Sequence, residues 1–303
     1  MKFTILKKDK TSRARIGVIE TLHGAIQTPV FMPVGTQGTV KAMTPRDLDE
    51  AGAEIILGNT YHLHLRPGDR LISQMGGLHR FMAWDKPVLT DSGGFQAFSL
   101  GQVTTVTEEG VLFKSPLDGA LVHLTPETAI EIQENLAPDF MMAFDECLPY
   151  PATFEETEAS VQRTWRWALR SNSAWRKREE IALVGIVQGG FYQPLRKRSL
   201  ELLLEVDFPA YAMGGISVGE PKQFMNETVE AIIPQFPEEK PRYLMGVGTP
   251  EDLLFGVMSG VDMFDCTLPT RHGRTGQLFT RLGELNIKNA CYADDREPVD
   301  PKC

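Results

Sequence analysis

The chain has 303 residues, of which 42% are hydrophobic and 23% charged, and its formal net charge is −9. This composition excludes a mainly disordered chain, and the apolar runs fall far short of the ~20 residues that a membrane-spanning helix needs. The amino terminus lacks the apolar stretch and small-residue cleavage site of a signal peptide. The acidic balance argues against non-specific coating of nucleic acid but leaves room for a local basic patch.

Strands and turns are predicted for the first 40 residues. Apolar, β-branched runs then recur along the chain, and each ends in a polar residue or a glycine. They cover residues 53–59, 87–91, 140–145, 183–188, 210–214, 243–246 and 261–265. Continuous apolar runs of this length are typical of strands that are buried on both faces of a parallel sheet.

Helical patterns separate these runs. Three helices are expected to begin where a threonine precedes a proline, at Thr44, Thr125 and Thr249, because threonine caps a helix and proline suits its first turn. Further helices are expected over residues 153–178, 195–206 and 221–233. Residues 102–124 alternate around glycine turns, which predicts a β-hairpin insertion.

This alternation of strands and helices predicts an α/β fold, a (β/α)8 TIM barrel, with a doubly wound open sheet as the alternative. No linker or internal repeat divides the sequence. We therefore expect residues 1–303 to form a single barrel domain with an N-terminal β segment. Four widely spaced cysteines, at positions 147, 266, 291 and 303, fit no dense disulfide framework and indicate reduced thiols in the cytoplasm.

The active site of such folds lies at the carboxyl ends of the strands, so the residues that end the predicted strands are the first candidates. They are Asn59, Asp91, Asp145, Gln188, Gly214, Gly246 and Asp265. Three acids at one end of the barrel indicate a functional site, because buried like charges repel one another and need partners.

Asp265 and Asp91 are candidates for covalent and acid–base chemistry. An aspartate at a strand end can attack an anomeric carbon to form a glycosyl ester, while a second acid moves a proton on the departing or arriving group. The structural alternatives are a helix cap for Asp91 and an ion pair with Arg271 or Arg274 for Asp265.

Other strand ends could recognise a flat base. Asp145 can accept two hydrogen bonds from an N–H edge such as that of guanine, Gln188 can donate and accept, and Gly214–Gly215 offers bare backbone N–H groups. Phe95, which follows Asp91 and two glycines, could lie against the ring. Each of these residues taken alone could equally be structural.

Signals for metals and phosphates are weaker. His62 and His64 form a His-x-His pair after a strand end, but no comparable histidine or lysine elsewhere completes a catalytic metal site, so packing or hydrogen-bonding roles are expected. The sequence has no glycine-rich phosphate loop. A basic stretch after Asp265, with Arg271 and Arg274, suits phosphate groups or guanine edges.

Several motifs follow one another in order along the chain. They are Asp91-Ser-Gly-Gly-Phe-Gln, Phe144-Asp-Glu-Cys, Gln188-Gly, Gly214-Gly215 with Val218-Gly-Glu-Pro, Tyr243-Leu-Met-Gly-Val-Gly and Phe264-Asp-Cys with Leu-Pro-Thr-Arg. Together they resemble the bacterial tRNA-guanine transglycosylases, the queuine tRNA-ribosyltransferase family. The resemblance implies a (β/α)8 barrel and a pentosyltransferase without a catalytic cofactor. It would exchange the wobble guanine of tRNA for a 7-deazaguanine precursor of queuosine.

The resemblance also implies roles for individual residues. Asp265 would be the nucleophile on the ribose, and Asp91 the general acid and base. The base would be bound by Ser92, Gly93, Gly94, Phe95, Asp145, Gln188, Gly214, Gly215 and Met245. The tRNA anticodon loop would contact Gly246, Val247, Gly248, Thr249, Pro250, Glu251, Asp252, Thr270, Arg271, His272, Gly273 and Arg274. Cys147 and Val218 are the bacterial pair, which suits a small aminomethyl base better than queuine.

The sequence departs from the family pattern at its carboxyl end. The family carries a structural zinc site, built from a Cys-x-Cys-x-x-Cys run and a later histidine, whereas this sequence stops at Asp300-Pro-Lys-Cys303. Cys303 is the remaining candidate ligand, so the expectation is a chain cut off at the start of the zinc subdomain. A homodimer is expected if the missing tail is restored.

Two other functions stay open at this point. A retaining glycoside hydrolase would use the same two acids in an open cleft lined with aromatic residues, whereas Asp145, Gln188 and Gly215 favour a purine slot. A non-catalytic tRNA-binding partner subunit would not need both Asp91 and Asp265.

Overall fold

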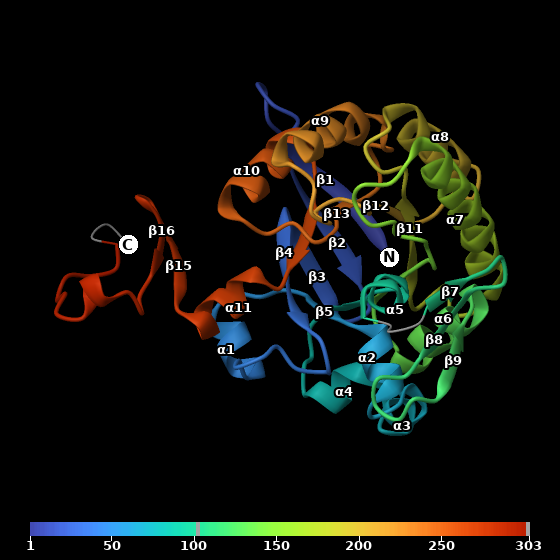
Figure 1. Ribbon diagram of the computed structural model, residues 1–303, viewed down its shortest axis with the longest axis horizontal. Helices are drawn as coiled ribbons and strands as arrows, with labels where there is room; N and C mark the ends of the chain where they lie inside the picture. Colours follow the sequence, from blue (N-terminus) through green and yellow to red (C-terminus); the bar gives the residue numbers. More distant parts are fainter. Residues whose placement is uncertain (101–103, 301–303) are drawn as a thin grey trace.

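Eight parallel strands close into a barrel in the computed structural model, which describes residues 1–100 and 104–300 (Figure 1). The strands are β4 (Val30–Gly35), β5 (Ile56–Gly58), β6 (Val88–Thr90), β10 (Phe140–Met142), β11 (Ala182–Val187), β12 (Ala210–Met213), β13 (Arg242–Leu244) and β14 (Met263–Cys266). The predicted TIM barrel is confirmed, and closure excludes the open doubly wound sheet. All seven predicted runs supply strands, and the eighth, β4, comes from the amino-terminal segment and pairs with β14 and β5.

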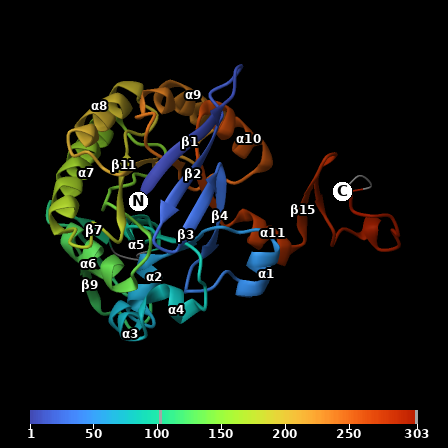
Figure 2. The same cartoon turned by 180° about the vertical axis from the view of Figure 1, so that it is seen from behind.

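Helices form a ring around the strands, which both views show (Figure 1 and Figure 2). The helices of the described residues are α1 (Pro45–Glu50), α2 (Thr60–Leu65), α3 (Asp69–Gln74), α4 (Gly77–Met82), α5 (Gly94–Leu100), α6 (Pro126–Leu136), α7 (Phe154–Ala174), α8 (Gln193–Leu204), α9 (Lys222–Ile232), α10 (Pro250–Ser259) and α11 (Leu268–Thr275). Short 3-10 turns lie at Ile233–Gln235 and, in the segment beyond the barrel, at Ala290–Tyr292. Thr44, Thr125 and Thr249 cap α1, α6 and α10 as predicted.

The core divides into layers because side chains alternate along each strand. In β10, Phe140 and Met142 point into the barrel, where they pack with Val184 and Ile186 of β11. Met141 points outward instead and packs in the layer between the strands and the helices. Burial on both faces is the reason that these strands are apolar throughout.

A three-stranded antiparallel sheet covers the amino-terminal end of the barrel. Its strands are β1 (Lys2–Lys8), β2 (Arg15–Thr21) and β3 (Gly24–Thr28). Ile19 and Ile26 are fully buried in the same cluster as Phe140, which lies in the first position of β10. This end of the barrel is therefore closed, which leaves the carboxyl end for a site.

The insertion expected as a β-hairpin contains three antiparallel strands, β7 (Thr104–Val106), β8 (Val111–Lys114) and β9 (Leu121–Leu124). A further hairpin, β15 (Gln277–Thr280) and β16 (Gly283–Asn286), extends away from the barrel beyond α11 (Figure 1). Among the helices of the described residues, none has the length and apolar character that crossing a membrane requires.

Candidate active site

The carboxyl ends of the barrel strands enclose a cavity of about 400 Å³. The structure gathers in its wall most of the residues predicted for catalysis and base binding. These are Asp91, Ser92, Phe95, Asp145, Gln188, Gly214, Gly215, Met245 and Asp265, and Gly246, predicted to contact tRNA, lines the cavity as well. Cys147 and Val218 also line it. Residues far apart in the sequence thus share one cavity, as the strand ends of a barrel require.

Asp91 is buried at the end of β6 and accepts hydrogen bonds on both carboxylate oxygens. Oδ1 accepts from the backbone N–H groups of Thr60, at 2.8 Å, and Gly93, at 3.2 Å. Oδ2 accepts from the side-chain amides of Asn59, at 2.5 Å, and Gln96, at 2.8 Å. Burial nevertheless raises the pKa of Asp91 to about 6, and the nearby charge of Asp265 adds to this. An acid with such a pKa can exchange a proton near neutral pH.

Asp265 lies on β14 and is held by a pair of donors. Its Oδ1 accepts from the Tyr243 hydroxyl at 2.5 Å and from the Gly246 backbone N–H at 2.8 Å. Within the described part of the chain, Oδ2 receives no donor, and neither Arg271 nor Arg274 pairs with this acid. Burial raises the pKa of Asp265, whereas the bonds from Tyr243 and Gly246 act in the opposite direction. The site therefore presents an oriented carboxylate with one oxygen available.

Asp145 follows β10 and is buried against two polar partners. Ser92 Oγ donates to Oδ1 at 3.0 Å, and Gln188 Nε2 donates to Oδ2 at 2.7 Å. Burial raises the pKa of Asp145 to about 6. The backbone of the Asp91-Ser-Gly-Gly-Phe motif packs closely against Asp145. A Cβ on Gly94 would lie 2.9 Å from the Asp145 carbonyl oxygen, so a side chain would not fit there. Carboxylate, amide and hydroxyl thus meet on one side of the cavity.

The residues expected to contact tRNA occupy two loop-to-helix segments. Gly246, Pro250, Glu251, Arg271, Gly273 and Arg274 are exposed, whereas Thr249, Asp252, Thr270 and His272 are half-buried. Val247 packs in the core, and a Cβ on Gly248 would clash with Cys266. The side chain of Thr249 caps α10, and Asp252 pairs with Lys222 at 2.7 Å. The structure therefore gives several of these residues a local structural role.

Three polar partners of the acids had no role assigned from the sequence. They are Asn59 and Gln96, which donate to Asp91, and Tyr243, which donates to Asp265. For Asn59, its position at a predicted strand end was the feature of the sequence that could have indicated a place in the site. Tyr243 begins a strand run, where a tyrosine is usually a core residue, so its hydroxyl contact depends on the closed barrel.

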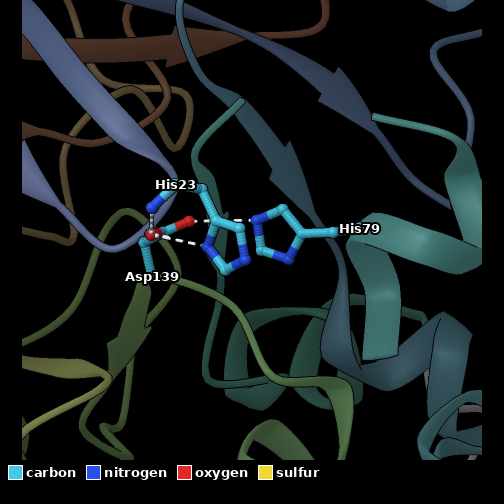
Figure 3. Close-up of side chains that lie close together, drawn as sticks. All are labelled: His23, His79 and Asp139. Atoms are coloured by element: carbon cyan, nitrogen blue, oxygen red, sulfur yellow. Dashed lines mark hydrogen bonds and ion pairs between the residues drawn. The ribbon is translucent and has the colours of Figure 1, made fainter. Parts of the chain in front are cut away.

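One group of three possible metal ligands lies within the described residues, at the opposite end of the barrel (Figure 3). His23 Nδ1 and His79 Nε2 each lie 3.0 Å from a different oxygen of Asp139. The two imidazole rings stack with centroids 3.6 Å apart and an interplanar angle of 17°. A metal ion could not lie in the planes of both stacked rings, so the geometry favours hydrogen bonds to the carboxylate. His62 lines the cavity, whereas His64 bonds to Asp69.

The three cysteines of the described residues do not come together as a zinc site. Cys147 and Cys266 are buried, Cys291 is exposed, and all three are free thiols. None of them belongs to a ligand group within the described residues. Cys303, the predicted zinc ligand, lies outside the residues that the structure describes.

Comparison with known proteins identifies the family. The model of the family described as queuine tRNA-ribosyltransferase matches residues 9–303. Queuine tRNA-ribosyltransferase from Caldanaerobacter subterraneus is 55% identical over 303 residues, which are all of this chain and 81% of the relative. The enzyme of that name from Lysinibacillus sphaericus is 56% identical over 303 residues, all of this chain and 80% of the relative. That from Halothermothrix orenii is 56% identical over 301 residues, 99% of this chain and 80% of the relative.

A matching family model over nearly the whole chain agrees with the barrel and with the clustered acids of its cavity. The chain belongs to the queuine tRNA-ribosyltransferase family and is a tRNA-guanine transglycosylase, an enzyme of the glycosyltransferase type.

Proposed function

We propose that the cavity carries out base exchange by double displacement through a covalent ribosyl ester of Asp265. The free Oδ2 of Asp265 attacks C1′ of the wobble guanosine, and the bond between C1′ and N9 of guanine breaks. Asp91 gives its proton to the departing base. The incoming base then loses a proton to Asp91 as its nitrogen attacks C1′ and releases Asp265. These reaction steps need no catalytic cofactor.

The observation that carries this proposal is the placement of both acids beside a set of base-binding groups. The Asp145 carboxylate would accept the N–H edge of guanine in place of the Gln188 amide, which then turns to the base. Gly215 would donate its N–H to the 6-oxo group. Phe95, which is 48% exposed, and Met245 would enclose the ring from its two faces.

The size of the incoming base would be limited by Cys147 and Val218, which stand in the cavity wall. As in the bacterial members that the sequence resembles, this pair would admit a small substituent on a 7-deazaguanine ring. We propose an aminomethyl precursor of queuosine as the incoming base, with guanine as the departing one. The tRNA anticodon loop would lie over the exposed residues of the two loop-to-helix segments and present a flipped wobble nucleotide.

Several assignments accompany this proposal. Residues 1–303 would act as one barrel domain with its N-terminal β segment, and a homodimer would form where the zinc-binding tail is present. A cytoplasmic location suits a tRNA substrate and three free thiols.

The test is exchange of radiolabelled guanine into an unmodified tRNA with a wobble guanine, using the 303-residue chain. Incorporation that depends on Asp265 and Asp91 is the expected result. Binding of guanine without incorporation would contradict turnover by this chain. A chain that binds no guanine would refute the assignment of the cavity.

A further inference from the structure

Arg196 is a fully buried arginine on α8, behind the base-binding side of the cavity. Its guanidinium donates to four backbone carbonyls. Nε lies 2.8 Å from the oxygen of Gly190, and Nη1 lies 2.8 Å from that of Val187 and 2.6 Å from that of Gly214. Nη2 lies 3.1 Å from the oxygen of Gly215. These carbonyls belong to the loops at the ends of β11 and β12, which hold Gln188 and Gly214–Gly215.

This arginine makes no ion pair with any residue that the structure describes, which is unusual for a buried charge. Burial lowers the pKa of Arg196 to about 10, and the nearest opposing influences come from Cys147 and Glu220. The guanidinium therefore stays charged at neutral pH; within the described residues its direct partners are backbone carbonyls, and the charge of Glu220 adds a more distant stabilisation. A plain packing role at this position would be filled at lower cost by an apolar side chain.

The backbone around Arg196 is closely packed. A Cβ on Gly189 would lie 2.7 Å from the backbone nitrogen of Arg196, and a Cβ on Gly215 would lie 2.3 Å from Gln188 Oε1. Gly189 and Gly215 also have positive φ angles, of 137° and 62°. The two loops are therefore packed directly against each other, with the guanidinium as the group that joins them.

The peptide unit between Gly214 and Gly215 links this arginine to the cavity. Its carbonyl accepts the shortest of the Arg196 bonds, and its N–H, that of Gly215, faces the Cys147 thiol in the cavity wall. A donor on the carbonyl of a peptide polarises that unit, so its N–H becomes a stronger donor. The Arg196 guanidinium thus lies at the carbonyl side of this peptide, and the Gly215 N–H donor lies at the side of the cavity.

We propose that Arg196 is a positioning residue that orients and polarises the Gly214–Gly215 peptide, so that the Gly215 N–H binds the 6-oxo group of the base. The inference rests on the proposed function, because it assumes that guanine lies in the cavity. It assigns part of the selectivity for 6-oxopurines to a residue that does not touch the base. Negative charge that develops on the 6-oxo group as guanine departs would be stabilised by the same arrangement.

The experiment compares guanine with 2-aminopurine, which lacks both the 6-oxo group and the N1–H that Asp145 would bind, by calorimetry and by competition in the exchange assay. The result that matters is therefore the change in the preference for guanine between the wild type and the variant. In Arg196→Met we expect the dissociation constant of guanine to rise about five- to tenfold, the range expected when one neutral hydrogen bond to the base is lost. That of 2-aminopurine should rise less than about threefold, so the preference for guanine falls. Arg196→Lys, which keeps the charge, should retain part of the preference. The KM for guanine should change more than the KM for tRNA.

Arg198→Met is the matched control, because Arg198 lies on the same helix, is half-exposed and pairs with Glu201. It should leave both dissociation constants unchanged. Equal weakening of the two ligands, or unchanged guanine binding, in Arg196→Met would overturn the proposal. If circular dichroism shows that Arg196→Met is unfolded, the ratio of the dissociation constants of 2-aminopurine and guanine is measured on Arg196→Lys instead. Failure of the wild-type chain to bind guanine would instead refute the proposed function.

Discussion

At the scale of single residues, the site depends on carboxyl groups that are identical in chemistry and different in surroundings. Among residues 1–100 and 104–300, Asp265 has donors on Oδ1 alone, whereas Asp91 has donors on both oxygens. The first arrangement leaves an oxygen for attack, and the second holds a carboxyl group in place while a proton comes and goes. Environment therefore supports the division of roles between nucleophile and acid–base group.

Asp265→Ala should abolish covalent capture of tRNA while guanine affinity stays within about threefold. The base-binding groups are on other strand ends, so they remain in place. Base exchange should fall by at least about a thousandfold, as expected when a nucleophile is removed. Capture is measured as a protein–RNA adduct on a denaturing gel, and guanine binding by calorimetry. Retained capture together with lost guanine binding would reverse the roles given to Asp265 and to the base-binding residues.

Guanine binding should depend on the ionisation of Asp145. Because burial raises the pKa of this carboxyl to about 6, guanine should bind most tightly above pH 7. Its dissociation constant should rise about tenfold for each pH unit below 6, since one proton competes with the ligand. Asp145→Asn should bind guanine at least about tenfold more weakly and lose this slope. A wild-type dissociation constant that is flat from pH 5 to 8 would contradict the assignment.

The same shift in pKa affects folding with a definite sign. The Asp145 carboxyl has a higher pKa in the folded than in the unfolded state. Its ionisation therefore lowers the free energy of unfolding of the protein as the pH rises through about 4 to 6. Asp145→Asn should therefore be more stable than the wild type above pH 6, by on the order of 1–3 kcal/mol. The difference should vanish near pH 4. Urea unfolding at several pH values measures it.

Residue identity and strand-end position were enough to predict that the three acids and Gln188 share one cavity. Their partners could not be predicted in the same way. Tyr243 and Asp265 are on adjacent strands, and their contact depends on the register with which β13 and β14 pair. Arg196 belongs to none of the motifs, and its contacts with the carbonyls of two separate loops depend on the folded structure.

At the scale of elements, the barrel strands could be predicted because burial on both faces leaves an unbroken apolar run. The role of β4 could not, because it follows the three-stranded sheet directly and resembles its strands in composition. Its partners, β14 and β5, are separated from it by very different lengths of chain. Closure is a property of the whole strand order, which local patterns do not contain.

Helix α11 is the element on which the tRNA contact is most directly tested. Arg271 and Arg274 are exposed on it, and Arg274 donates to the carbonyl oxygen of Thr270 at 2.9 Å. Arg271→Ala and Arg274→Ala should each raise the KM for tRNA about three- to tenfold at moderate salt. Each should also lower the slope of log KM against log salt by about 0.7–0.9, as one phosphate contact is lost.

Neither change on α11 should alter guanine affinity, because both side chains lie outside the cavity wall. Arg198→Ala, on the outer helix α8, is the control for a general effect of positive charge. If Arg198→Ala weakens tRNA binding as much as the changes on α11, the contact is non-specific attraction and the RNA does not lie on α11.

At the scale of the whole molecule, the two ends of the barrel are divided between chemistry and stability. The carboxyl end holds buried acids with raised pKa values, an arrangement that costs folding free energy. The amino end holds acids that are fully partnered. Burial alone would raise the pKa of Asp139, but bonds from His79, Val88 and His23 outweigh it and hold that pKa well below its usual range. Stability from this end offsets the cost of the site.

The ion pair of Arg15 and Asp262 is the strongest candidate for that stability. Arg15, on β2, contacts Asp262 with Nε–Oδ1 at 2.8 Å and Nη2–Oδ2 at 2.5 Å, and the side chains are 3% and 0% exposed. The Asp262 carboxylate also accepts from the backbone N–H of Arg242. The pair thereby fastens the amino-terminal sheet to β13 and β14.

Arg15→Met should lower the free energy of unfolding by about 3–5 kcal/mol, because it leaves the Asp262 carboxylate buried without its counter-charge. Arg46→Met removes an exposed pair with Glu50 and should cost less than about 1 kcal/mol. The double variant Arg15→Met with Asp262→Asn should recover part of the loss, since the unpaired charge is then gone. Guanine binding at 20 °C should be unchanged in the folded fraction, because the pair is at the other end of the barrel. A cost for Arg15→Met no larger than that of Arg46→Met would show that the amino-terminal sheet is held by its apolar contacts alone.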